Sequence, residues 1–233
     1  PAGSPHQPTY DGATSSRADQ IPQDLARRRN WPRQAFVTLQ HDEYSLPASE
    51  LVPALLRAAA RRRARGPELD LMKRWDFVMR RDDAAPLINT AWLRDLAAAV
   101  YRPRFGDRTR ERGRAYDLPT VIRLVRSPDR VFGANPEAAR DSMVLAAFDQ
   151  AVAKVRAEVG GAVSSWRWGD LHQAHFRHPL ASAFDLPSIR RGGDDNTVNM
   201  TAGNGWTQSA GAAHPGVLGP AHLHHPRCPP VSP

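Results

Sequence analysis

Two short runs in the last third of the chain hold the residue types best suited to chemistry. Residues 164–179 read SSWRWGDLHQAHFRHP and combine two tryptophans, a phenylalanine, an aspartate and three histidines. Residues 192–199 read GGDDNTVN and join two glycines to carboxyl, amide and hydroxyl side chains. Imidazole and carboxyl groups can transfer protons or bind metals, whereas glycine beside Asp and Asn is typical of tight turns.

The spacing of the first run predicts how its indoles are presented. Trp166 and Trp168 alternate with their neighbours, so on an extended chain both point to one face. Gly169 and Asp170 can then turn the chain, and the residue before Pro179 is kept out of the helical region. We therefore expect short strands from residue 163 onward, with an indole face that needs a partner.

The histidines are candidates for a metal site by composition. His172, His175 and His178 are spaced by three, which alternates faces on a strand, and the following proline breaks a helix. We therefore expect hydrogen-bonded histidines and no metal. A second set with ligand chemistry is His222, His224, His225 and Cys228. Their proline-rich surroundings offer no supporting second shell, which favours a chance cluster.

The polar residues of the second run have two readings. Asp194, Asn196 and Asn199 lie beside glycine and favour turns in which side chains bond to nearby backbone. Their alternative role is to hold the wall of an active site.

Together the two runs resemble the penicillin acylase family, the N-terminal nucleophile (Ntn) amidohydrolases that include penicillin, cephalosporin and acyl-homoserine lactone acylases. The pattern is Trp-x-Trp-Gly-x-x-His, then Phe-x-His-Pro-Leu, then Gly-Gly-Asp and Thr-Val-Asn. The matching residues are Trp166, Trp168, Gly169, His172, Phe176, His178, Pro179, Leu180, Gly192, Gly193, Asp194, Thr197, Val198 and Asn199. Further matches are Arg17-Ala18-x-x-Ile21, the Gln-x-Asp-x-x-Ser of residues 40–45, and Trp75-Asp76. The resemblance covers the late part of the family's large (β) chain.

The resemblance implies an α+β fold: a helix-rich fragment of the αββα N-terminal nucleophile hydrolase fold, with two stacked antiparallel sheets between helical layers. It also implies a nucleophile at the first residue of the β chain, usually Ser in a Ser-Asn-x-Trp sequence, and an asparagine that stabilises the oxyanion. Residues 1–233 contain no Ser-Asn pair, and residues 1–16 contain no Asn. We therefore expect no catalytic residue in this chain and no activity from it alone.

The expected partners and cofactors follow from the same resemblance. The missing parts are the α chain and the N-terminal part of the β chain, and the complete enzyme would take a small acyl amide, a β-lactam or an acyl-homoserine lactone. The family's calcium site has its ligands upstream, so we expect no cofactor in this segment. A periplasmic or secreted location is implied, although the first residues do not read as a signal peptide.

Composition limits the other classes of function. The chain has 233 residues, of which 41% are hydrophobic, enough for a core, and no apolar run long enough to span a membrane. The net charge of +8, carried almost wholly by arginine, raises nucleic-acid binding as an alternative. A solvated arginine-rich surface is favoured because no nucleic-acid motif accompanies the charge. A non-catalytic helical interaction protein is the third reading.

Periodicity and capping residues divide the chain. Residues 1–16 read as an irregular lead-in, 17–212 as the acylase segment (helical over 45–160, sheet-associated over 163–205), and 213–233 as a Pro/His-rich tail. We interpret the tail as a shifted reading frame or an unrelated end, which resequencing across Gly211 tests. We expect helices over 17–29 and 68–79. Another should run from a Ser45 or Ser49 cap to Gly66-Pro67, and another from an Asp82 or Asp83 cap through residue 100. The last should run from an Asn135 cap to Gly160-Gly161. The type of 118–125 is left open.

Overall fold

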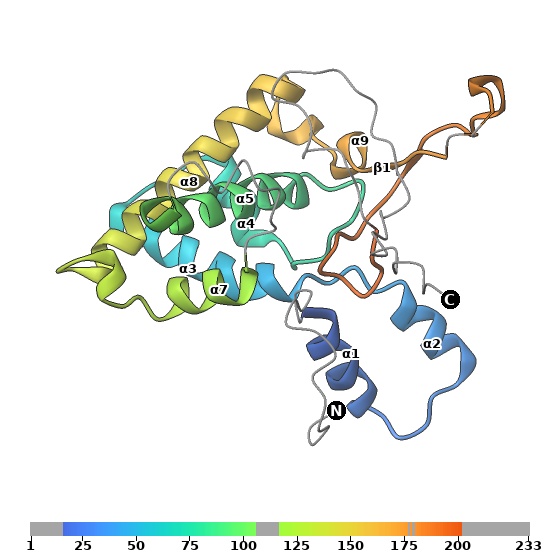
Figure 1. Ribbon diagram of the computed structural model, residues 1–233, viewed down its shortest axis with the longest axis horizontal. Helices are drawn as coiled ribbons and strands as arrows, with labels where there is room; N and C mark the ends of the chain where they lie inside the picture. The colour runs from blue at the N-terminus through green and yellow to red at the C-terminus, as the bar shows by residue number, and fades with distance from the viewer. Residues whose placement is uncertain (1–15, 106–116, 177, 179, 202–233) are drawn as a thin grey trace, which may run out of the picture.

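Helices that bury one apolar face form the body of the molecule. The longest are α3 (Leu46–Arg62), α5 (Ala85–Phe105) and α8 (Pro136–Val159), with α4 (Pro67–Arg74) and α7 (Leu118–Arg126) beside them. Figure 1 shows these five helices grouped together. The computed structural model describes residues 16–105, 117–176, 178 and 180–201, so the expected lead-in before Ser16 and the tail after Thr201 lie outside the described residues.

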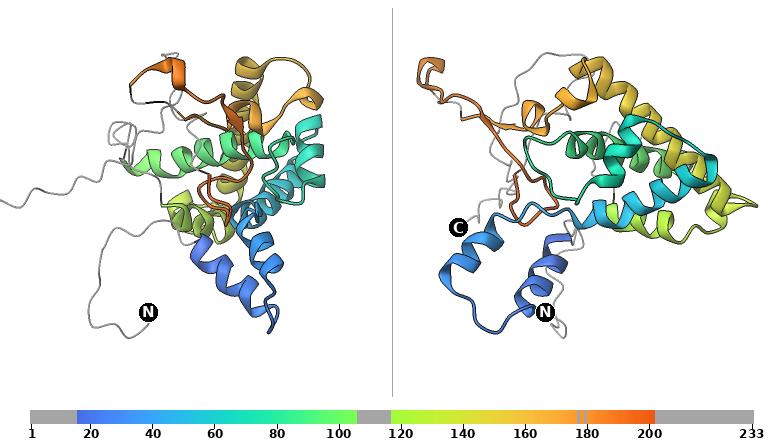
Figure 2. Two further views of the ribbon diagram at one scale, coloured as in Figure 1. Left: turned by 90° about the vertical axis from the view of Figure 1, so that its right-hand side faces the viewer. Right: turned by 180° about the vertical axis from the view of Figure 1, so that it is seen from behind.

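Two smaller parts lie beside this body. α1 (Ser16–Ala26) and α2 (Arg33–Gln40) form a helical pair that stands away from it, as Figures 1 and 2 show. The chain after α8 runs through two short 3-10 turns and the single-turn helix α9 (Trp168–Leu171) into a narrow ribbon that projects from the body.

Two predicted helix starts are confirmed by their capping bonds. The side chain of Ser45 accepts a hydrogen bond from the Ala48 amide, and that of Asn135 accepts one from Ala138. Asp117 caps α7 in the same way, which resolves 118–125 as a helix. Each cap satisfies an amide that the first helical turn leaves without a partner.

The end of α3 differs from the prediction. The helix stops at Arg62 because Arg63 adopts a left-handed conformation with φ 52°, and Gly66-Pro67 instead begins α4. α4 in turn ends at Arg74, short of the expected residue 79.

The packing of α5 against α8 forms the centre of the core. The expected stripe on α5 is confirmed, since Trp92 is fully buried, meets Phe148 edge-on at 6.4 Å and donates its indole N–H to the Val144 carbonyl. Also buried on that stripe are Ile88, Leu96 and Val100. On α8 the buried face is rotated by about one residue from the expected one and consists of Val144, Ala147, Phe148, Ala151 and Val155.

The expected strands from residue 163 onward are mostly absent from the described part of the chain. Val163–Ser165 is a 3-10 turn, and the only sheet described pairs β1 (Gln173–Ala174) antiparallel to β2 (Ile189–Arg190). Gln173 lies opposite Arg190 in this register. The helix-rich character is confirmed, whereas the stacked sheets stay a prediction. No helix among the described residues is long and apolar enough to cross a membrane.

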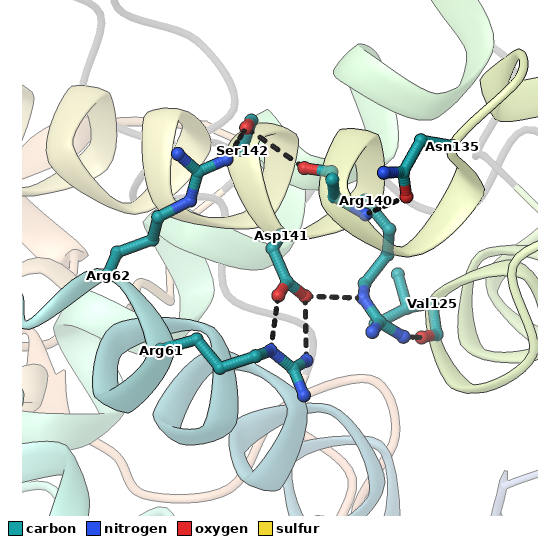
Figure 3. A network of polar contacts seen from close by, with 8 residues as sticks. Arg61, Arg62, Val125, Asn135, Arg140, Asp141 and Ser142 are labelled. Atoms are coloured by element: carbon teal, nitrogen blue, oxygen red, sulfur yellow. Dashed lines mark hydrogen bonds and ion pairs between the residues drawn. The ribbon is translucent and has the colours of Figure 1, made fainter.

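A buried carboxyl group joins α3 to α8, as Figure 3 shows. Asp141 accepts two hydrogen bonds from Arg61, at 2.6 and 3.0 Å, and one from Arg140 at 2.8 Å. Arg140 is itself buried and also donates to the Val125 carbonyl at the end of α7. One carboxylate and two guanidinium groups thus connect three helices, and the carboxylate is the counter-ion of the buried Arg140 guanidinium.

Removing this carboxylate should destabilise the body. Asp141→Ala leaves the buried Arg140 guanidinium without its counter-ion, so we expect a loss of about 3 kcal/mol in the free energy of unfolding. Arg62→Ala is the control, because Arg62 bonds only to the exposed Ser142 hydroxyl, and it should change stability by less than about 0.5 kcal/mol. Urea unfolding of both variants measures the difference, and equal losses would contradict a central role for Asp141.

The Asp141 carboxylate also predicts that the stability of the chain depends on pH. Burial alone would raise the pKa of Asp141, but the hydrogen bonds from Arg61 and Arg140 outweigh it and hold the pKa below its ordinary 3.8. A depressed carboxyl pKa gives stability that is present at neutral pH and is lost as the pH falls through the folded-state pKa. The stability advantage of the native chain over Asp141→Asn should therefore shrink below about pH 4 in acid titrations of unfolding.

Candidate functional site

Four segments that are far apart in the sequence meet at one place, which we call the signature junction: residues 42–45, 77–83, 166–172 and 190–199. The central segment is 77–83, between α4 and α5. Its Phe77 carbonyl accepts from the Ser45 amide at 2.9 Å, and its Met79 carbonyl accepts from Gly193 at 2.8 Å. Farther along, the Arg81 carbonyl accepts from Gly169 at 2.7 Å and the Asp83 carbonyl from Trp168 at 2.9 Å.

Further bonds close the junction around this segment. The Met79 amide donates to the Glu43 carbonyl and the Asn199 amide to the Asp42 carbonyl, both at 2.8 Å. The Arg191 amide donates to the His172 carbonyl at 2.9 Å. The structure therefore brings the Trp-containing run, the Gly-Gly-Asp run and the 40–45 motif into direct contact.

Both signature tryptophans are buried within the chain, which corrects the expectation that their face lacks a partner. The Trp166 indole donates to the Gly160 carbonyl at 2.7 Å, and the Arg156 guanidinium lies over its ring. The Trp168 indole donates to the Gly193 carbonyl at 3.1 Å. Exposed large apolar side chains occur instead on the projecting ribbon: Phe176, Leu180, Phe184, Leu186 and Ile189.

The motif glycines lie where atoms of neighbouring segments come close to the backbone. A Cβ at Gly169 would lie 3.0 Å from the Arg81 Cβ and 3.1 Å from that of Arg190. A Cβ at Gly192 would lie 2.3 Å from a Glu43 carboxyl oxygen. Gly193 has φ +70°, and a Cβ there would lie 2.3 Å from the Asn199 carbonyl oxygen.

The reading of the Asp-Asn run as a turn is supported by its bonds. One Asp194 carboxyl oxygen accepts from the amides of Asn196 and Thr197, at 2.7 and 3.1 Å. The buried Thr197 hydroxyl accepts from the Asp194 amide and lies 2.9 Å from the Asn199 carbonyl. Burial raises the pKa of Asp194, partly offset by the hydrogen bonds at Asn196.

Sequence reasoning missed Glu43, a side chain that joins the 40–45 motif to the 192–199 run. Its carboxyl group accepts from the Asn199 side chain at 3.1 Å and covers Gly192. Burial raises the pKa of Glu43, and the Asn199 hydrogen bond and the Arg191 charge offset this only in part. The 40–45 match could have drawn attention to it, but nothing in the spacing pairs residue 43 with 199.

The three signature histidines face different partners. His172 is buried, stacks on Trp168 at 4.4 Å and has each ring nitrogen 3.0 Å from a carbonyl oxygen, of Arg191 and of Thr201. His175 and His178 lie on the ribbon, where His178 meets Phe184 edge-on. Among the described residues no three His, Cys, Asp or Glu side chains form a group that could hold a metal. Pro179 and the tail histidines lie outside the described residues.

One nucleophile-type contact is present on the ribbon. The Ser188 hydroxyl lies 2.6 Å from His175 Nδ1, across the two arms of the ribbon. Acyl transfer also needs a group that orients the histidine and donors for the oxyanion. The described contacts of this exposed pair include neither, so it is a bond between the arms and not a catalytic dyad.

Comparison with known families decides the identity. A sequence model of the family described as penicillin amidase matches residues 1–225. The chain belongs to the penicillin amidase family. This confirms the resemblance carried by the two runs and places the chain in a family of hydrolases. No curated protein sequence matches the chain.

The range of the penicillin amidase match extends beyond the signature runs. It includes residues 1–16 and reaches 225, inside the segment 213–233 that we interpret as frame-shifted or unrelated. Resequencing across Gly211 remains the test of that interpretation.

Gly193 offers a test of how tightly the junction is built. Gly193→Ala adds a Cβ both to a left-handed backbone and against the Asn199 carbonyl, so we expect a loss of more than about 2 kcal/mol in the free energy of unfolding. Gly160→Ala is a matched control: its φ is +67°, but nothing lies within 4 Å of its Cβ position. With ψ −170°, Gly160 lies in a region that glycine alone adopts readily, so this control should lose about 1–3 kcal/mol for the backbone alone and Gly193→Ala distinctly more. Chemical denaturation measures both, and equal losses would exclude the close approach as the cause.

Glu43 gives a pH effect of opposite sign to that of Asp141. A raised carboxyl pKa means that the contribution of Glu43 to stability is present below its ordinary 4.5 and is lost as the pH rises through the folded-state pKa. Glu43→Gln keeps an acceptor for Asn199 without a charge, so it should be more stable than the native chain at neutral pH. The difference should vanish toward about pH 4.

Thermal melts across this pH range measure the effect. Glu50→Gln is the control, because Glu50 pairs with Arg126 at 2.9 Å and loses an attraction when neutralised. A Glu43→Gln variant that is less stable than the native chain at pH 7 would overturn the assignment.

Proposed function

We propose that this chain is part of an amidohydrolase that cleaves an acyl amide through an N-terminal serine. The bond cleaved would join an acyl chain to a β-lactam nucleus, a homoserine lactone or a similar amine. The single observation that carries the proposal is family membership over residues 1–225. The burial of Trp166, Trp168 and Thr197 at one junction supports it, because the motif residues serve as the interior of a folded unit.

In this mechanism the serine hydroxyl attacks the amide carbonyl, and the α-amine of the same residue takes the hydroxyl proton. The tetrahedral intermediate collapses to an acyl ester, the amine leaves with a proton, and water hydrolyses the ester. Losing one oxyanion donor costs about 10²–10³ in rate in such reactions. We assign none of these catalytic roles to residues 1–233, since they contain no Ser-Asn pair and no asparagine before Asn30.

The proposed role of this chain is therefore support. The signature junction would fix the position of the 190–199 segment against the 77–83 segment, next to whatever carries the nucleophile. An α chain and an N-terminal β-chain segment are the proposed partners, and the calcium site implied by the family would lie in those parts.

The test is an activity assay on the purified chain. Residues 1–233 alone should release no amine above the buffer rate from phenylacetyl or long-chain acyl amides. Turnover would show that a catalytic set is present after all. In that event Ser188→Ala separates the exposed Ser188–His175 pair from the serines before α1, which are Ser4 and Ser15, and from Ser16 at its start.

The positive arm of the test uses the chain within a complete enzyme. When co-produced with an α chain and an N-terminal β-chain segment of an acylase, the native chain should support amine release and Gly193→Ala should not. Activity in the complex that is unaffected by Gly193→Ala would contradict the supporting role of the junction.

A further inference from the structure

The inward face of α1 is polar. Ile21 and Leu25 lie four residues apart on one face of the helix, but Leu25 is among the exposed large apolar side chains. The buried stripe of α1 consists instead of Ser16, Gln20 and Asp24. A helix that turns polar side chains inward must find partners for their polar atoms.

Two acceptor atoms on this stripe have no such partner among the described residues. Asp24 is only 6% exposed; its Oδ1 pairs with Arg27 at 2.9 Å, and its Oδ2 is buried without a hydrogen bond. One helical turn earlier, the Gln20 amide donates its Nε2 to Asp42 at 2.9 Å. Because a carboxylate can only accept here, this bond fixes the amide orientation and leaves Gln20 Oε1 as a second buried acceptor without a donor.

Asp24 lines a cleft of about 790 Å³ between α1, α2 and the 41–43 and 78–80 segments. Apolar side chains form part of its wall: Trp31, Pro32, Ala35, Leu39 and Val78. The Trp31 indole is held in place by donating to the carbonyls of Leu25 and Arg28.

The arginines that line the cleft already have partners. Arg27 binds the other oxygen of Asp24, Arg28 lies over the Trp31 ring at 5.1 Å, and Arg80 is paired with Asp76 and Asp83. None of these contacts supplies a donor to Asp24 Oδ2. The residues that precede α1, 1–15, contain neither Lys nor Arg.

We propose that this cleft binds an ammonium or guanidinium group carried on a small apolar body, with the Asp24 carboxylate as its main acceptor. A charged N–H donor is the chemistry that a buried carboxylate oxygen favours most, and the Trp31 side of the cleft suits the apolar part. The group can belong to a free organic amine or to a Lys or Arg side chain of another polypeptide. The proposal does not depend on acylase activity.

Calorimetric titration of the full chain tests the proposal with three probes. 2-Phenylethylammonium supplies the free amine, the peptide N-acetyl-lysine methylamide supplies the side chain, and 2-phenylethanol has the same apolar body without the charge. We expect one of the first two to bind saturably, at least about tenfold more tightly than the alcohol. The probe that binds identifies the source of the group, and no binding of either at millimolar concentration overturns the proposal.

Two substitutions locate the site. Asp24→Asn replaces the acceptor oxygen by an amide and should weaken binding at least about tenfold. Asp95→Asn is the matched control, because Asp95 also pairs one oxygen with a basic side chain, Lys154, and buries an unpartnered Oδ2, but lies on α5 outside the cleft. It should bind as the native chain does, and equal binding by both variants would overturn the assignment.

Binding can also be located without any variant. Should Asp24→Asn fail to fold, as judged by its melting transition, NMR of the native chain is the deciding measurement. Added probe should shift the Trp31 indole N–H and the Gln20 side-chain amide, and shifts confined to other parts of the chain would contradict the site.

Discussion

Every second carbonyl of residues 77–83 accepts a hydrogen bond from another segment of the chain, and the arrangement of the molecule depends on this pattern. The donors are the amides of Ser45, Gly193, Gly169 and Trp168. A non-helical segment has no helical ladder to satisfy its carbonyls, so the bonds from neighbouring segments fix its path. Met79, at the centre, is fully buried. The segment therefore aligns the start of α3, the start of α5, the Trp run and the Gly-Gly run relative to one another.

The same constraint explains a strained residue. Phe77 has φ +64°, a conformation that a bulky side chain rarely adopts. Its carbonyl accepts from the amide of Ser45, the residue that caps α3, and its ring meets those of Tyr44 and Trp75 edge-on at 6.3 and 5.7 Å. Contacts on both backbone and ring hold the residue where the local preference alone would not, which is how such strain persists in a folded chain.

The features that could be predicted from sequence are those with a local cause. The Ser45 and Asn135 caps and the buried stripe of α5 depend on residues within a few positions of one another, so spacing reveals them. The polar inward face of α1 and the role of Glu43 were not predictable. Both depend on contacts with residues far along the chain, Asp42 for α1 and Asn199 for Glu43.

The prediction of strands around Trp166 and Trp168 was wrong for a related reason. Alternation around Trp166 and Trp168 fits a strand, but each indole donates to a different carbonyl, Gly160 and Gly193. Reaching both requires the chain to pass through a 3-10 turn before Trp166 and a helical turn from Trp168. Tertiary hydrogen bonds thus override the local pattern, as they often do for short segments.

Charge is used in two opposite ways around these contacts. Asp141 is buried with two guanidinium groups that keep its carboxyl pKa low, whereas the pKa values of the half-buried Glu43 and of Asp194 are raised by burial that their hydrogen bonds offset only in part. Several arginines of this basic chain act as internal connections, such as Arg190, which joins Asp82 to Asp170. This use of arginine accounts for part of the positive composition without a nucleic-acid partner.

The signature residues explain how a motif can identify a family without containing its reaction. Gly193 is needed because its backbone has positive φ and the Asn199 carbonyl leaves no room for a Cβ, Gly169 and Gly192 lie against the side chains of neighbouring segments, and the Thr197 hydroxyl bonds within a closed turn. None of these requirements involves a substrate. The sequence pattern is specific because several segments must pack closely at the same place. A chain that satisfies these packing requirements forms the junction whether or not it also carries a nucleophile. Recognition of these residues therefore reports the fold, and the chemistry has to be established separately.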